Sequence, residues 1–172
     1  IGDRVALHPG AAGFGLGNGG QEGGFARRLL VRGASANRSL FALPDDMPFS
    51  IAALAEPLGV GMHAVDQSEA CQGDKVAVLG AGPIGLSAIA TLADRGIEDV
   101  IAIDLSETRL DVARKLGAAH TVNPGKEDLW DALGRIHGTS KLHWMDLVNT
   151  NVFIEATGVG PVLSDVIARC AA

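Results

Sequence analysis

The chain has 172 residues, of which 47% are hydrophobic and 20% are charged, a balance typical of a folded globular protein. Its formal net charge is −6 and it contains no Tyr, which argues against nucleic acid and against an anionic membrane surface as partners. The two cysteines, Cys71 and Cys170, make neither a disulfide framework nor a C-x-x-C metal motif, and no apolar run is long enough to cross a membrane. We therefore expect a cytoplasmic protein.

Three short strands are predicted early in the chain, over residues 3–8, 25–31 and 39–43. Each is a mostly apolar run bounded by turn residues, and Pro44 ends the third. Residues 10–24, between the first two runs, are rich in glycine and offer few apolar anchors, which predicts a loop.

A short helix is expected next, with Ser50 as its N-cap and Ile51 and Leu54 on its apolar side. Pro57 should break or restart this helix, because proline cannot donate the helical hydrogen bond. A further helix is predicted over residues 58–65.

Residues 75–86 form the most informative stretch of the sequence. They predict a short buried strand, a tight glycine turn and the first turn of a helix, with three glycines at the spacing G-x-G-x-x-G. In a dinucleotide-binding unit the first glycine makes the turn, the second admits the pyrophosphate and the third lets the helix pack on the strand. The candidate cofactor-binding residues of this turn are Gly80, Gly82, Pro83, Ile84 and Gly85.

An acidic residue follows the next predicted strand, over residues 100–103. Asp104 comes nineteen residues after Gly85, close to the spacing of about 20 at which an acid meets the adenosine ribose hydroxyls. A carboxylate there accepts hydrogen bonds from the ribose of NAD and repels the 2′-phosphate of NADP. The sequence therefore predicts NAD as the cofactor.

Helices and strands alternate through the rest of the chain. Helices are predicted over 106–117 and 126–136, strands over 120–122 and 152–154, and a last helix after the second of these strands. Such alternation implies right-handed crossovers and an α/β fold with a doubly wound, Rossmann-type parallel sheet. The stretch 137–151 is less regular, and no element is assigned to it.

Several short motifs follow one another in an order that resembles the zinc-containing medium-chain dehydrogenases, in the branch of the sorbitol, threonine and butanediol dehydrogenases. They are Gly2-Asp3-Arg4-Val5, Gly23-Gly24-Phe25-Ala26, Leu43-Pro44-Asp45, Ala52-Ala53-Leu54-Ala55-Glu56-Pro57-Leu58, Met62-His63-Ala64-Val65, Gly73-Asp74-Lys75-Val76 and Gly80-Ala81-Gly82-Pro83-Ile84-Gly85. The resemblance implies that residues 1–60 are the end of a GroES-like catalytic domain. Residues 61–172 would then be an NAD(P)-binding Rossmann domain that stops after its fourth strand. The chain is thus expected to be an internal fragment that is itself inactive.

The resemblance also implies roles for single residues. Arg109 would reach the adenosine ribose, and Thr157 and Gly158 would line the cofactor cleft; otherwise they are a solvated cation and an ordinary turn. Glu56 would approach a catalytic zinc directly or through water; otherwise it is a carboxylate that caps local backbone. The other zinc ligands of the family match no residue of this chain, and no catalytic residue is assigned.

The function implied by the resemblance is NAD-dependent, zinc-assisted oxidation of a small alcohol or polyol, by an enzyme that is a homo-oligomer. Two alternatives stay open. A zinc-free, NADPH-dependent enzyme of the quinone-reductase kind is disfavoured by Asp104. A non-catalytic nucleotide-binding module would keep the glycine turn without needing Glu56.

Overall fold

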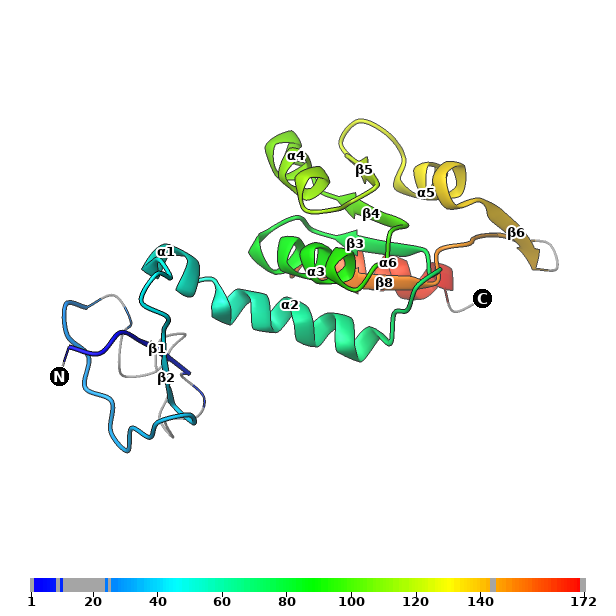
Figure 1. Cartoon of the computed structure of the whole chain (residues 1–172). Helices are drawn as coiled ribbons and strands as arrows, with labels where there is room; N and C mark the ends of the chain where they lie inside the picture. Colours follow the sequence, from blue (N-terminus) through cyan, green and yellow to red (C-terminus); the bar gives the residue numbers. More distant parts are fainter. Residues whose placement is uncertain (1, 9, 11–23, 25, 143–144, 171–172) are drawn as a thin grey trace. The chain divides into compact units, whose positions relative to one another are not determined.

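The computed structural model describes residues 2–8, 10, 24, 26–142 and 145–170 (Figure 1). The chain divides into two compact units, Ile1–Glu56 and Pro57–Ala172. This division falls four residues before the domain boundary expected from the sequence, and the GroES-like nature of the first unit stays a prediction. No helix among the described residues is long and apolar enough to cross a membrane.

The first unit contains one small antiparallel sheet. Strand β1 (Val5–Leu7) pairs with β2 (Leu40–Ala42), as expected for the first and third predicted runs. The strand predicted over 25–31 is wrong: residues 26–31 are irregular, and residue 25 and most of the glycine-rich stretch lie outside the described residues. Leu30 is 63% exposed, so this run lacks the burial on which β-propensity depends.

Both helix starts in this region differ from the expectation. Helix α1 (Phe49–Ala52) has Pro48 rather than Ser50 as its N-cap, because the Pro48 carbonyl accepts from the N–H groups of Ile51 and Ala52. Helix α2 (Ala55–Ser68) begins before Pro57 rather than after it. A proline is tolerated in the first turn of a helix, where its missing N–H would have no helical partner.

The second unit is built on a four-stranded parallel sheet with the strand order β5-β4-β3-β8 (Figure 1). The strands are β3 (Val76–Leu79), β4 (Val100–Ile103), β5 (His120–Val122) and β8 (Val152–Glu155). The chain runs outward from β3 to β5 and then returns to the other side of β3. This order confirms the Rossmann-type sheet, and the carboxyl ends beside the reversal are where ligands bind in such sheets.

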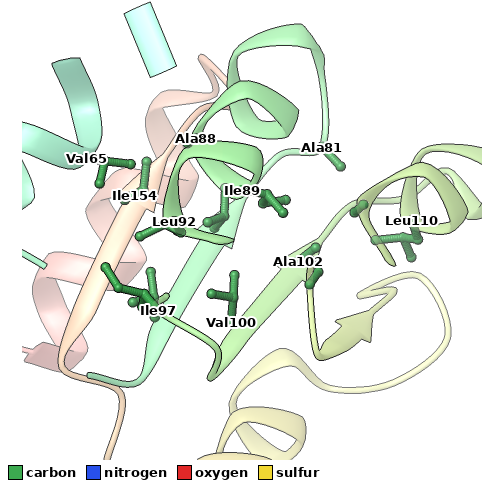
Figure 2. Close-up of a cluster of buried hydrophobic side chains, with 14 residues drawn as sticks. Val65, Ala81, Ala88, Ile89, Leu92, Ile97, Val100, Ala102, Leu110 and Ile154 are labelled. Atoms are coloured by element: carbon green, nitrogen blue, oxygen red, sulfur yellow. The ribbon is translucent and has the colours of Figure 1, made fainter. Parts of the chain in front are cut away.

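Helices cover both faces of this sheet. Successive strand residues alternate between two apolar clusters, because neighbouring side chains of a strand point to opposite faces. Figure 2 shows the first cluster, in which helices α3 (Pro83–Asp94) and α4 (Glu107–Lys115) contribute Ile89, Leu92 and Leu110. Helices α5 (Leu129–His137) and α6 (Gly160–Cys170) cover the other face. The structure therefore confirms the four helices that were predicted between and after the strands of this sheet.

Two details of these helices differ from the sequence prediction. Helix α5 starts three residues later than expected, because the Asp128 carboxylate accepts from the backbone N–H groups of Trp130 and Asp131 and so makes the N-cap. The stretch 137–151, to which no element was assigned, contains an antiparallel hairpin of β6 (Thr139–Leu142) and β7 (Met145–Val148).

A buried histidine lies at the amino-terminal edge of the sheet, where α5 ends. The Nδ1 atom of His137 is 2.8 Å from the Thr150 hydroxyl. Its Nε2 is 3.2 Å from Asp99 Oδ1 but makes no hydrogen bond with the described residues. Burial lowers the pKa of His137, as does the nearby Lys75 ammonium, against an opposing effect of Asp99.

We expect His137 to make the free energy of unfolding depend on pH. Because its pKa is lower in the folded chain, the unfolded chain takes up the proton more readily, so stability falls as the pH drops through about 6.5. Urea unfolding between pH 7.5 and pH 5.5 should show a smaller loss of stability in His137→Gln than in the unsubstituted chain. Substitution of the exposed His63 by Gln should leave the loss unchanged. An equal loss in His137→Gln would contradict the assignment.

Candidate functional site

A pocket of about 830 Å³ lies at the carboxyl ends of the parallel strands. Residues that follow β3, β4, β5 and β8 line it, together with residues of α5 and α6. Five of the residues singled out from the sequence are in its lining: Gly80, Gly82, Asp104, Arg109 and Thr157.

The geometry of the glycine turn is compatible with the role expected for each of its three glycines. Gly80 has φ of +93°, and a Cβ added there would lie 2.9 Å from the backbone of Ala156. A Cβ added to Gly85 would lie 1.8 Å from the carbonyl oxygen of Gly80, so only glycine lets α3 start this close to β3. A Cβ added to Gly82 would meet no described atom within 4 Å, so this glycine faces open space.

The other two residues of the turn lie beside the pocket rather than in its lining. Pro83 is the first residue of α3, and Gly82 is its N-cap. Pro83 is exposed and Ile84 is half-buried. The start of α3 presents unbonded N–H groups and the positive end of the helix dipole, an arrangement that suits an anion.

Asp104 is held at the pocket wall by two backbone groups. Its Oδ2 accepts a hydrogen bond from the N–H of Ala81 and its Oδ1 accepts one from the N–H of Ser106, both at 2.8 Å. The side chain is only 9% exposed, and the nearest charge is the Arg109 guanidinium, 3.6 Å from Oδ2. The carboxylate thus joins the glycine turn to the start of α4. Ser106 is the N-cap of α4 but, within the described chain, its side chain makes no capping bond.

The turn after β8 forms the opposite wall. The N–H of Thr157 donates to Glu155 Oε1 at 2.7 Å, and the Thr157 hydroxyl accepts from the N–H of Val159 at 3.0 Å. Gly158 has φ of +69° and lies beside the pocket, outside its lining. The structure therefore brings Thr157 to the same cavity as Asp104, with Gly158 as the residue that allows the turn.

Glu56 lies apart from any described set of metal ligands. It is exposed, in the first turn of α2. Among the described residues, no three His, Cys, Asp or Glu side chains lie close enough to hold a metal ion. The described residues thus do not fit a zinc site, and the role of Glu56 stays a prediction.

Apolar residues that the sequence analysis did not select make up much of the pocket wall. Leu105, Pro124 and Val159 lie just beyond the carboxyl ends of β4, β5 and β8, and Val162 and Val166 come from α6. The first three could have been found, because ligands bind outside the carboxyl ends of the strands in sheets of this kind.

Fold and pocket together define a Rossmann-type α/β unit with a pocket at the carboxyl ends of its strands. The sequence model of the family described as zinc-binding dehydrogenase matches residues 83–172, and the chain belongs to this family. It is 35% identical over 145 residues to the L-threonine 3-dehydrogenase of Deinococcus deserti, covering 84% of this chain and 39% of that protein. It is 40% identical over 103 residues to the galactitol 1-phosphate 5-dehydrogenase of Escherichia coli K12, covering 60% of this chain and 29% of that protein.

A solved structure gives the same result for the fold. The 2R,3R-butanediol dehydrogenase of Bacillus subtilis superposes with a TM-score of 0.62 and 37% sequence identity, over 77% of this chain and 35% of that chain. The chain thus spans less than two fifths of the length of each of these relatives.

Gly85→Ala should destabilise the second unit, because its Cβ would meet the Gly80 carbonyl oxygen. We expect a loss of about 3 kcal/mol in the free energy of unfolding, the upper end of the cost of overpacking. The matched control is Gly59→Ala in α2, where an added Cβ meets no described atom within 4 Å. That change should raise stability by about 0.5–1 kcal/mol. Urea unfolding measures both, and equal effects of the two substitutions would contradict the packing argument.

Proposed function

We propose that the pocket binds NAD, and that the whole protein uses it to oxidise a small alcohol or polyol by hydride transfer. The diphosphate of the cofactor would lie at Gly80, Gly82 and the start of α3, where Pro83 and Ile84 open the helix and Gly85 keeps it close. Backbone N–H groups and the helix dipole would bind the negative charge there.

The observation that carries this proposal is the position of Asp104. Its nearly buried carboxylate lines the same pocket as the glycine turn and is hydrogen-bonded to that turn through Ala81. Each carboxylate oxygen has a second lone pair that can accept from a ribose hydroxyl. The same negative charge would repel a 2′-phosphate, so the site favours NAD over NADP.

The remaining walls suit the rest of the adenosine. Leu105, Pro124 and Val159 offer apolar surface to the flat adenine ring. Arg109 is 58% exposed beside Asp104, where its guanidinium can reach the ribose. Thr157 would line the cleft toward the nicotinamide side, and Gly158 beside it would allow the turn.

The activity rests on the family and on the named relatives. The relatives are dehydrogenases of threonine, galactitol 1-phosphate and butanediol, all of which carry alcohol groups. NAD supplies the hydride-accepting carbon in this chemistry. Zinc would act in the whole protein with Glu56 as one candidate ligand, although the described residues by themselves do not fit a zinc site. The GroES-like domain over residues 1–60, the homo-oligomer and the cytoplasmic location are parts of the same proposal.

The zinc-free, NADPH-dependent alternative is not favoured. The family match is to the zinc-binding dehydrogenases, and the fixed charge of Asp104 opposes the 2′-phosphate of NADPH. The second alternative was a module that binds nucleotide without catalysis. The relatives described above are all named dehydrogenases, so none of them supports it.

Titration of the 172-residue chain with NADH and with NADPH tests the cofactor assignment. We expect NADPH to bind at least about tenfold more weakly, a difference of about 1.4 kcal/mol. Asp104→Ala should lower the ratio of the NADPH dissociation constant to the NADH dissociation constant, because it removes the charge that repels the 2′-phosphate. Asp111→Ala, which removes an exposed carboxylate from α4, should leave the ratio unchanged. If NADPH binds as tightly as NADH, or if Asp104→Ala preserves the ratio, the assignment of NAD is wrong.

A further inference from the structure

We propose that Asp104 is also a positioning residue: by holding the backbone N–H groups of Ala81 and Ser106, it fixes the glycine turn in the shape that receives the diphosphate before any nucleotide binds. This inference rests on the proposed binding of NAD and deepens it. Asp104 would therefore contribute to affinity in two separable ways, through the ribose hydroxyls that it contacts and through the diphosphate that it does not contact.

The burial of the two ends of this bridge is the first argument. Ala81 is 0% exposed, so in the folded chain the acceptor of its N–H is the Asp104 carboxylate and not water. The Asp104 side chain is 9% exposed and accepts from Ala81 at 2.8 Å. A buried N–H without an acceptor is rare and unfavourable, so the turn has to shift when this bond is lost.

The second argument is how the turn is held elsewhere. The N–H of Gly80 donates to the Ile103 carbonyl at 2.7 Å, and the N–H of Ala156 donates to the Leu79 carbonyl at 2.8 Å. These bonds fix the turn up to Gly80. The next hydrogen bond of α3 is the one from the N–H of Leu86 to Gly82. Between the two, Asp104 binds the N–H of Ala81, next to the glycine that faces the pocket.

The anchoring of Asp104 itself is the third argument. Its own N–H donates to the Val122 carbonyl at 3.2 Å, which fixes its backbone to β5. Its second oxygen is held by Ser106 at 2.8 Å. A residue held at three points, two on its carboxylate and one on its backbone, can act as a rigid support, whereas a carboxylate that bound only a ribose would be free to rotate without nucleotide.

A cycle of two ligands and two proteins separates the positioning role from the ribose contact. The ligands are ADP and 2′,3′-dideoxy-ADP, which keeps the diphosphate and lacks both ribose hydroxyls. The proteins are the 172-residue chain and Asp104→Asn, whose amide has one acceptor oxygen and cannot serve both N–H groups. If Asp104 acts only on the ribose, the two proteins bind the dideoxy ligand equally.

When Asp104 is neutralised, its charge and its positioning role predict opposite changes in the affinity for the diphosphate. Neutralising a carboxylate near an anionic diphosphate strengthens binding by Coulomb's law. We expect Asp104→Asn to bind 2′,3′-dideoxy-ADP at least fivefold more weakly than the unsubstituted chain. Equal or tighter binding would overturn the proposal. Asp111→Asn, which neutralises an exposed carboxylate of α4, should not weaken binding.

Amide hydrogen exchange without nucleotide gives a readout that does not depend on affinity. The N–H groups of Ala81 and Ser106 should both exchange slowly in the unsubstituted chain, and at least one of them should exchange at least tenfold faster in Asp104→Asn, with the amides of β4 unchanged. Free exchange at Ala81 in the unsubstituted chain would overturn the positioning role. Failure to bind ADP at all, with slow exchange at Ala81, would instead contradict the proposed NAD site.

If Asp104→Asn does not fold, a second variant tests the positioning role of Asp104. Asp104→Glu keeps the charge and an acceptor for the ribose but moves the carboxylate by one methylene. It should also bind 2′,3′-dideoxy-ADP more weakly and lose protection at Ala81. Full affinity and full protection in Asp104→Glu would overturn the proposal.

Discussion

The close contact between the first turn of α3 and the end of β3 is the constraint on which the pocket depends. Gly85 lies so near the Gly80 carbonyl that no side chain fits between them, and Gly80 itself has a positive φ. Because the helix starts this close to the strand, its amino end lies directly above the carboxyl ends of the sheet. The amino end of α3, where Gly82 is the N-cap, thereby lies beside the pocket at the neighbouring strand ends.

The sequence predicted the second unit well for a physical reason. Its central strands β3 and β4 are buried on both faces, and all four strands alternate with helices, so each forms a short apolar run and the alternation determines the parallel topology. The first unit was predicted less well. Residues 26–31 have the composition of a strand but remain irregular with Leu30 exposed, because a strand exists only with a partner and a buried face. The hairpin of β6 and β7 was missed since local pairing leaves little periodic signal in so short a stretch.

The candidate site divides in a similar way. The glycines and Asp104 were found because their roles depend on spacing along the chain, and the structure places Gly80, Gly82 and Asp104 in one pocket. Leu105, Pro124 and Val159 were not selected, although each lies just beyond the carboxyl end of a predicted strand; their residue type carries no chemical signal, so only that position points to them. The bond from Ala81 to Asp104 joins residues 23 apart in sequence and has no signature in either residue type. Glu56 could not be decided from its position, since a zinc site needs several ligands and one carboxylate is compatible with many roles.

The electrostatics of the pocket present a problem that the backbone resolves. A nearly buried carboxylate beside the expected position of a diphosphate should oppose binding by like-charge repulsion. The Asp104 carboxylate itself is bound by two backbone N–H groups and lies 3.6 Å from the guanidinium of Arg109. The free N–H groups at the start of α3 remain for the ligand. Because the N–H groups that bind the carboxylate differ from those left free at the start of α3, the pocket can hold a negative charge at Asp104 and still offer donors to an anion.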